Sequence, residues 1–162
     1  MIDHRQDVIE TVWEQVVRTF SDKDLHHPES ARLSLDPSRH DSCRHFAATT
    51  MDGSEVLVAP DLADMPYETM LAILAHEAGH VEDLCSPGVW WFREGRLRRV
   101  SFPKRGAKGL VRSWQDRSDD EVERVADAIA ELALGQRIGY VGHAGCLVQS
   151  VGRGTRRPKG LT

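Results

Sequence analysis

The sequence predicts one domain of α+β class, built from three amphipathic helices and a small antiparallel sheet. Apolar residues recur at helical spacing over residues 3–20, 66–84 and 119–134, and three short runs of strand-forming residues lie between residues 31 and 59. The chain has 162 residues, of which 40% are apolar and 28% charged, and a formal net charge of -4. A chain of about 150 residues buries a sizeable core without disulfides or a structural metal, so any metal is expected to serve chemistry.

The N-terminal half begins with a predicted helix and continues into the predicted sheet. In residues 3–20 the apolar side chains lie three or four residues apart, which is typical of a helix that buries one face. Strands are predicted at residues 31–35, 43–50 and 55–59. The last two are separated by a segment containing Asp52-Gly53, a strong hairpin signal, so we expect antiparallel pairing.

The second half is predicted to hold the other two helices, separated by a basic segment. Pro66 stands where a first-turn proline belongs and predicts a helix over 66–84. Residues 86–115, rich in Gly, Arg and Lys, are expected to form a long loop or hairpin excursion. A helix over 119–134 follows, with Ser118 or Asp119 as its cap and Gly135 at its end. Two short strands (137–141 and 146–151) are expected to close the single domain at residue 151, and residues 152–162 to form a basic tail.

Charge is segregated along the chain. Residues 45–92 contain eight acidic side chains and no Lys or Arg, whereas residues 93–112 contain eight basic residues and one Glu. Such a basic block is typical of a solvated face, but it can also steer an acidic partner or nucleic acid towards the protein. The apolar runs are far shorter than the about 20 residues of a membrane helix, and the N-terminus lacks a signal core. With three scattered cysteines (Cys43, Cys85 and Cys146), we expect a cytoplasmic protein with no membrane partner.

The pattern that carries chemistry is His76-Glu77-Ala78-Gly79-His80. Residues four apart share one face of a helix, so His76 and His80 would present their imidazoles to one metal ion, with Glu77 beside them. The alternative is an ordinary amphipathic helix with exposed polar residues. Inside a helix, Gly79 costs about 1 kcal/mol relative to alanine, which predicts a close neighbour at this position.

A catalytic zinc site needs a third protein ligand and an open position. The helix predicted at 119–134 offers Glu123, 43 residues after His80. Asp127, one turn later on the same face, could accept the spare ring N–H of a ligand histidine and fix its tautomer. The neighbouring acids are rivals for this role, because a solvated acidic first turn is ordinary in a helix. They are Asp119, Asp120 and Glu121.

The two motifs, HEAGH at 76–80 and ERVAD at 123–127, together resemble the pattern of gluzincin metallopeptidases. They are most similar to the ImmA/IrrE-like group, and the pattern is also seen in HtpX-like peptidases and minimal gluzincins. The resemblance covers residues 55–134 and implies a zincin-like fold, in which the active-site HExxH helix packs on the ligand-bearing helix. It implies Zn2+ held by His76, His80 and Glu123, with Glu77 as general base. The basic excursion and the C-terminal segment lie outside the resemblance, so substrate identity does not transfer.

The predicted function is hydrolysis of peptide bonds in a specific protein or peptide substrate, by a regulatory protein of the kind carried by phages or mobile elements. Zinc acidifies its bound water, and Glu77 takes the proton and returns it to the leaving amine. The strand at 55–59 is the expected sheet edge for binding an extended substrate. Tyr140 and His143 are candidate oxyanion donors, and Cys85 is a candidate to mask the zinc in a latent state.

Two other functions stay open from the sequence. The same pocket could serve a non-hydrolytic zinc-binding module that uses the basic excursion to contact a protein or nucleic acid. Retention of Glu77 favours the enzyme, because a binding module needs no general base. Alternatively, the chain binds nucleic acid through residues 93–112 and the tail, which predicts a salt-dependent affinity for DNA.

Overall fold

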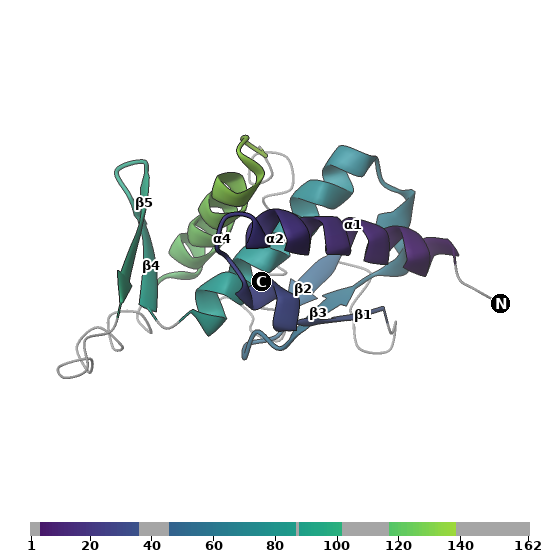
Figure 1. The fold of residues 1–162 in the computed structure, drawn as a ribbon, viewed down its shortest axis with the longest axis horizontal. Coiled ribbons are helices and arrows are strands. Elements are labelled where there is room, and N and C mark those ends of the chain that lie inside the picture. The colour runs from purple at the N-terminus through teal and green to yellow at the C-terminus, as the bar shows by residue number, and fades with distance from the viewer. Residues whose placement is uncertain (1–3, 36–45, 87, 102–116, 139–162) are drawn as a thin grey trace.

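The computed structural model describes residues 4–35, 46–86, 88–101 and 117–138. Within these ranges the chain is α+β, with three α-helices, a three-stranded sheet and a separate two-stranded hairpin (Figure 1). The helices confirm the sequence prediction closely. No helix in the described ranges is both long and apolar enough to cross a membrane.

Helix α2 (Tyr67–Cys85) lies at the centre of the molecule. It packs against α4 (Asp119–Leu134) on one side and α1 (His4–Ser21) on another, and its middle contacts strand β2 (Ala47–Thr49). Figure 1 shows α1 crossing in front of α2, with α4 beside it. Every residue of α2 from Ala72 to Asp83 is buried, which is the burial expected of a helix surrounded by other elements rather than one on the surface.

Local signals fix where these helices begin and end. Pro66 is the residue before α2, and its carbonyl accepts hydrogen bonds from the first turn of the helix. Ser118 caps α4, because its hydroxyl accepts a hydrogen bond from the N–H of Glu121 at 3.1 Å. Gly135 ends α4 in a left-handed conformation, with φ of 70°, that a glycine adopts without strain.

Helix α1 supplies much of the apolar core. Its buried side chains recur every three or four residues and form one stripe. This stripe faces α2 and the 3-10 helix formed by Pro60–Asp64. The buried residues of α1 are Ile9, Val12, Trp13, Val16 and Phe20.

The three-stranded sheet differs from the prediction in two respects. Its order is β1 (Arg32–Ser34), β3 (Glu55–Val58), β2, and β1 runs parallel to β3, so the sheet is mixed rather than antiparallel. The predicted hairpin between β2 and β3 is confirmed, with Gly53 in its turn at φ of 72°. Because that hairpin occupies one edge of β3, β1 pairs with the other edge and β3 becomes the central strand. The expectation that residues 55–59 form a sheet edge is therefore wrong.

The predicted excursion contains a two-stranded antiparallel hairpin, β4 (Gly88–Arg93) and β5 (Arg96–Ser101). Its two-residue turn is Glu94-Gly95, and both residues have positive φ, as a type I′ turn requires. Figure 1 shows the hairpin standing beside α4, apart from the three-stranded sheet. Residues 102–116 of the excursion, and the predicted tail, lie outside the described residues. Most of the predicted strands at 137–141 and 146–151 also lie outside them, and residues 137 and 138 belong to no strand.

Candidate metal centre

The predicted ligands lie where α2 and α4 are in closest contact. His76 and His80 are one turn apart on α2, and neither side chain is exposed to solvent. Gly79 makes the contact with α4 close, because a Cβ placed on it would lie 2.3 Å from the carbonyl oxygen of Ala126. This confirms the close neighbour expected from a glycine inside the helix. The absence of a side chain at residue 79 lets the backbone of α4 approach the two histidines.

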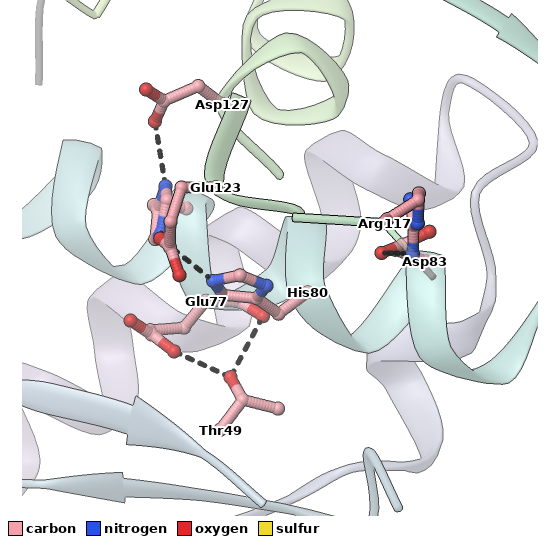
Figure 2. A network of polar contacts seen from close by, with 8 residues as sticks. Thr49, Glu77, His80, Asp83, Arg117, Glu123 and Asp127 are labelled. Carbon is pink, nitrogen blue, oxygen red and sulfur yellow. Dashed lines mark hydrogen bonds and ion pairs between the residues drawn. The ribbon is translucent and has the colours of Figure 1, made fainter. Parts of the chain in front are cut away.

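Glu123 of α4 reaches both histidines. Its Oε2 lies 2.8 Å from Nε2 of His76 and 3.3 Å from Nε2 of His80 (Figure 2). The candidate ligand atoms of these three buried residues all lie within 4.8 Å of one another, so the group could hold a metal ion. The rival acids of the first turn of α4 are not part of this group among the residues described.

Asp127 lies one turn beyond Glu123 and contacts the other nitrogen of His76. The Nδ1–H of His76 donates to Oδ1 of Asp127 over 2.7 Å. A carboxylate in this position fixes the ring orientation and leaves Nε2 to face the ligand cluster. This is the contact that the sequence spacing led us to expect for Asp127.

The carboxylates strongly perturb the acid–base properties of the cluster. Burial lowers the pKa of His76, but the hydrogen bonds and charges of Asp127 and Glu123 outweigh it and hold the pKa well above its usual value. Burial likewise opposes ionisation of Glu123, yet the charge of His80 and the hydrogen bond with His76 lower its pKa to about 2. Without a metal, the two carboxylates therefore favour the protonated form of the His76 imidazole.

The side chain of Glu77, the residue after His76, is hydrogen-bonded to a residue of strand β2. The hydroxyl of Thr49 in β2 lies 2.6 Å from Oε2 of Glu77 and 3.2 Å from its backbone carbonyl (Figure 2). The other oxygen, Oε1, is buried and has no hydrogen-bond partner within the described structure. Burial raises the pKa of the Glu77 carboxyl, although the nearby His80 and His76 oppose this effect.

A buried ion pair anchors the start of α4 on α2. Arg117, directly before the capping serine, contacts Oδ2 of Asp83 at 2.8 Å, and the two side chains are 1% and 0% exposed. The same guanidinium donates to the carbonyl of Trp90 in β4 at 3.1 Å. Arg117 therefore links α2, α4 and the hairpin, and it sets where α4 begins relative to the histidines.

Sequence reasoning missed Thr49, Asp83 and Arg117. Asp83 follows His80 by three residues and so shares its side of the helix, which is a signal that could have been used. No local pattern marks Thr49, because its contact with Glu77 joins residues 28 positions apart. For Arg117, its position before a helix cap says nothing about a partner 34 residues earlier.

Among the remaining predicted residues, the structure describes only Cys85. Tyr140 and His143 lie outside the described residues. The Cys85 thiol lies 3.7 Å from the carbonyl oxygen of Asp52 and 3.8 Å from that of Gly53, at the turn between β2 and β3. Cys85 is not part of the group of possible metal ligands among the described residues, so the structure gives no support to Cys85 as a zinc mask.

The geometry supplies two imidazole nitrogens, one carboxylate oxygen and an adjacent buried carboxylate. Two nitrogens and a carboxylate form one of the ligand sets of catalytic zinc. Comparison of the chain with protein-family models, with curated proteins and with solved structures finds no match.

Proposed function

We propose that this protein is a zinc-dependent peptidase with a zincin-like, gluzincin-type site. The single observation that carries the proposal is the convergence of His76, His80 and Glu123 from two packed helices, with Glu77 held beside them. The order of elements also supports it: an N-terminal helix, a small sheet, the HExxH helix and a second helix that bears the third ligand.

The donor set fits zinc. Ligand atoms about 2.1 Å from one ion at tetrahedral angles lie about 3.4 Å apart, and Nε2 of His80 lies 3.3 Å from Oε2 of Glu123. His76 and His80 would bind through Nε2, and Glu123 through a carboxylate oxygen. His76 must release a proton before its Nε2 can bind a metal. The contact of Asp127 with Nδ1 then holds the correct tautomer.

In the proposed reaction, zinc supplies Lewis acidity, which polarises a peptide carbonyl and lowers the pKa of a water to about 7. Glu77 takes the proton from the attacking water and returns it to the leaving amine. Thr49 holds Oε2 of Glu77, which leaves Oε1 to accept that proton. The raised pKa of Glu77 suits this exchange, because a base works best when its pKa approaches the working pH.

Strand β2 is the sheet edge that could hold an extended peptide beside Glu77. Phe46 accepts a backbone hydrogen bond from Ala59, and Thr50 donates one to Glu55, so alternate residues of β2 pair with β3. The backbone groups of Ala47 and Thr49 consequently face away from β3. Ala47 and Thr49 are 1% and 0% exposed, so an extended substrate could pair with them beside Glu77 only if this edge were uncovered.

Metal content and cleavage test the proposal together. We expect about one zinc per chain after dialysis without chelator, strong loss in His80→Ala and Glu123→Gln, and no loss in Glu121→Gln, the matched control on the same helix. Glu77→Gln should keep the zinc and lose cleavage of a proteome-derived peptide library. If the wild-type protein took up no zinc, the proposal would fail. If it held zinc but cut no peptide, the function would be a non-hydrolytic zinc-binding module.

A further inference from the structure

The β4–β5 hairpin has two different faces, which follow from its register. Trp90 lies opposite Arg99 and Phe92 lies opposite Leu97, so these residues share one face. Trp90 is 6% exposed, and Phe92 and Leu97 pack against the core. The hairpin contacts α4 through both strands. This face therefore attaches the hairpin to the body of the protein.

The other face is cationic and aromatic. Trp91 lies opposite Arg98, and Arg96 is two residues before Arg98 on the same side of β5. Arg96 and Arg98 are exposed and Trp91 is half-buried. Arg99, on the attached face, is also exposed, and its guanidinium lies 5.6 Å from the centre of the Trp90 ring. The outward surface of the hairpin thus combines an indole with several guanidinium groups.

The guanidinium groups of the hairpin differ in their neighbours from those of four other arginines in the protein. Arg5, Arg32, Arg117 and Arg124 each contact a carboxylate within 4.0 Å. Arg96, Arg98 and Arg99 contact no carboxylate among the described residues. Like charges gathered on neighbouring strands repel one another, so a hairpin with this pattern gains stability when an anion binds across it.

We propose that the outward face of the β4–β5 hairpin, carried by Trp91, Arg96 and Arg98, binds a strand of nucleic acid. Alternate residues of a strand lie about 7 Å apart, so Arg96 and Arg98 can contact separate phosphates, and a guanidinium binds phosphate with two hydrogen bonds. The half-buried indole of Trp91, opposite Arg98 on the same face, adds an aromatic ring against which an unpaired base can stack. An acidic peptide could form ion pairs with the two guanidinium groups, but it has no base that would stack on the indole of Trp91.

The exposed acidic residues within residues 45–92 lie outside the hairpin. They are Asp52, Asp61, Asp64 and Glu68, whereas the other four acidic residues of this range are buried. Exposed carboxylates repel a polyanion, and the arginines of the hairpin attract it. The proposal is independent of zinc and of peptide hydrolysis, because none of its residues belongs to the metal centre.

Fluorescence anisotropy of the full chain with a labelled mixed-sequence 20-nucleotide single strand tests this proposal. We expect affinity in the micromolar range at low salt. Arg96→Gln/Arg98→Gln should weaken binding at least tenfold and reduce the slope of log affinity against log salt by about 1.4, since each phosphate contact contributes about 0.7. Trp91→Ala should weaken it by about tenfold. The matched control Arg18→Gln/Lys23→Gln removes two exposed charges from the end of α1 and should change affinity less than twofold.

Circular dichroism and thermal melting establish that each variant is folded, and Arg96→Lys/Arg98→Lys, which keeps both charges, should retain most of the affinity. The proposal is overturned by any of three results. The first is no binding at low salt, and the second is equal weakening by the hairpin and control pairs. The third is preferential binding of a polyglutamate peptide over the oligonucleotide, which would make the partner an acidic protein. The proposed base stacking would also be refuted if a 20-base-pair duplex of the same sequence bound as tightly as the single strand and Trp91→Ala had no effect.

Discussion

Gly79→Ala is the substitution that most directly tests how α2 and α4 build the metal centre. The added Cβ would lie 2.3 Å from the Ala126 carbonyl oxygen, 3.0 Å from its carbonyl carbon and 3.1 Å from its Cα. Ordinary contacts begin near 3.4 Å, so the helices must separate by about 1 Å. All three atoms belong to the backbone, so no change of rotamer can relieve the overlap.

The Gly79→Ala substitution has two opposing effects on the free energy of unfolding. Alanine is favoured over glycine inside a helix by about 1 kcal/mol, whereas overpacking of this kind costs about 3 kcal/mol. We therefore expect a net loss of about 2 kcal/mol in the free energy of unfolding, and a Tm lower by about 4–8 °C in a chain of this size. Because Glu123 lies on α4 and would move with it, zinc affinity should fall about 10- to 100-fold.

Thermal unfolding of the metal-free protein and competition with a zinc chelator measure these two effects. Glu68→Ala, an exposed change on the same helix, is the control and should alter stability by less than about 0.5 kcal/mol. Ala126→Gly should not rescue Gly79→Ala, because the overlap is with the backbone of residue 126. A Gly79→Ala protein with unchanged or higher Tm and unchanged zinc affinity would refute the close packing of the two helices.

Three further predictions concern the residues around the cluster. Thr49→Val should reduce peptide cleavage about tenfold with zinc content unchanged, and Thr49→Ser, which keeps the hydroxyl, should restore it. Asp83→Asn leaves the charge of Arg117 buried and should cost about 3–5 kcal/mol in chemical denaturation, whereas Asp83→Leu/Arg117→Met should recover most of the loss. The raised pKa of His76 implies that its stabilising effect in the metal-free protein is complete below pH 6.5 and is lost as the pH rises through that pKa. Zinc binding must expel this proton, so calorimetry in two buffers should show proton release and an affinity that rises with pH; a pH-independent affinity would contradict this assignment.

The helices and the candidate metal ligands could be predicted because their signals are local. The spacing of His76 and His80 follows from helical geometry, and the need for a neighbour at Gly79 follows from the cost of glycine in a helix. Ser118 and Gly135 mark the ends of α4 by their own backbone preferences. The ERVAD motif indicates Glu123 as the third ligand, and the structure brings Glu123 to the histidines.

Contacts between distant segments could not be predicted from the sequence, because they depend on packing. The order of strands in the sheet depends on which edge of β3 remained available after the β2–β3 hairpin formed, and three-residue strands such as β1 carry too little pattern to show this. Thr49 and Arg117 acquire their roles from partners 28 and 34 residues away. The helices and the spacing of the candidate ligands on them therefore follow from the local sequence, because hydrogen bonding and side-chain periodicity within a helix are local. The orientation of Glu77 and the position of α4 depend on tertiary packing. The local sequence permits several arrangements of the strands and helices, and burial of the core selects one of them.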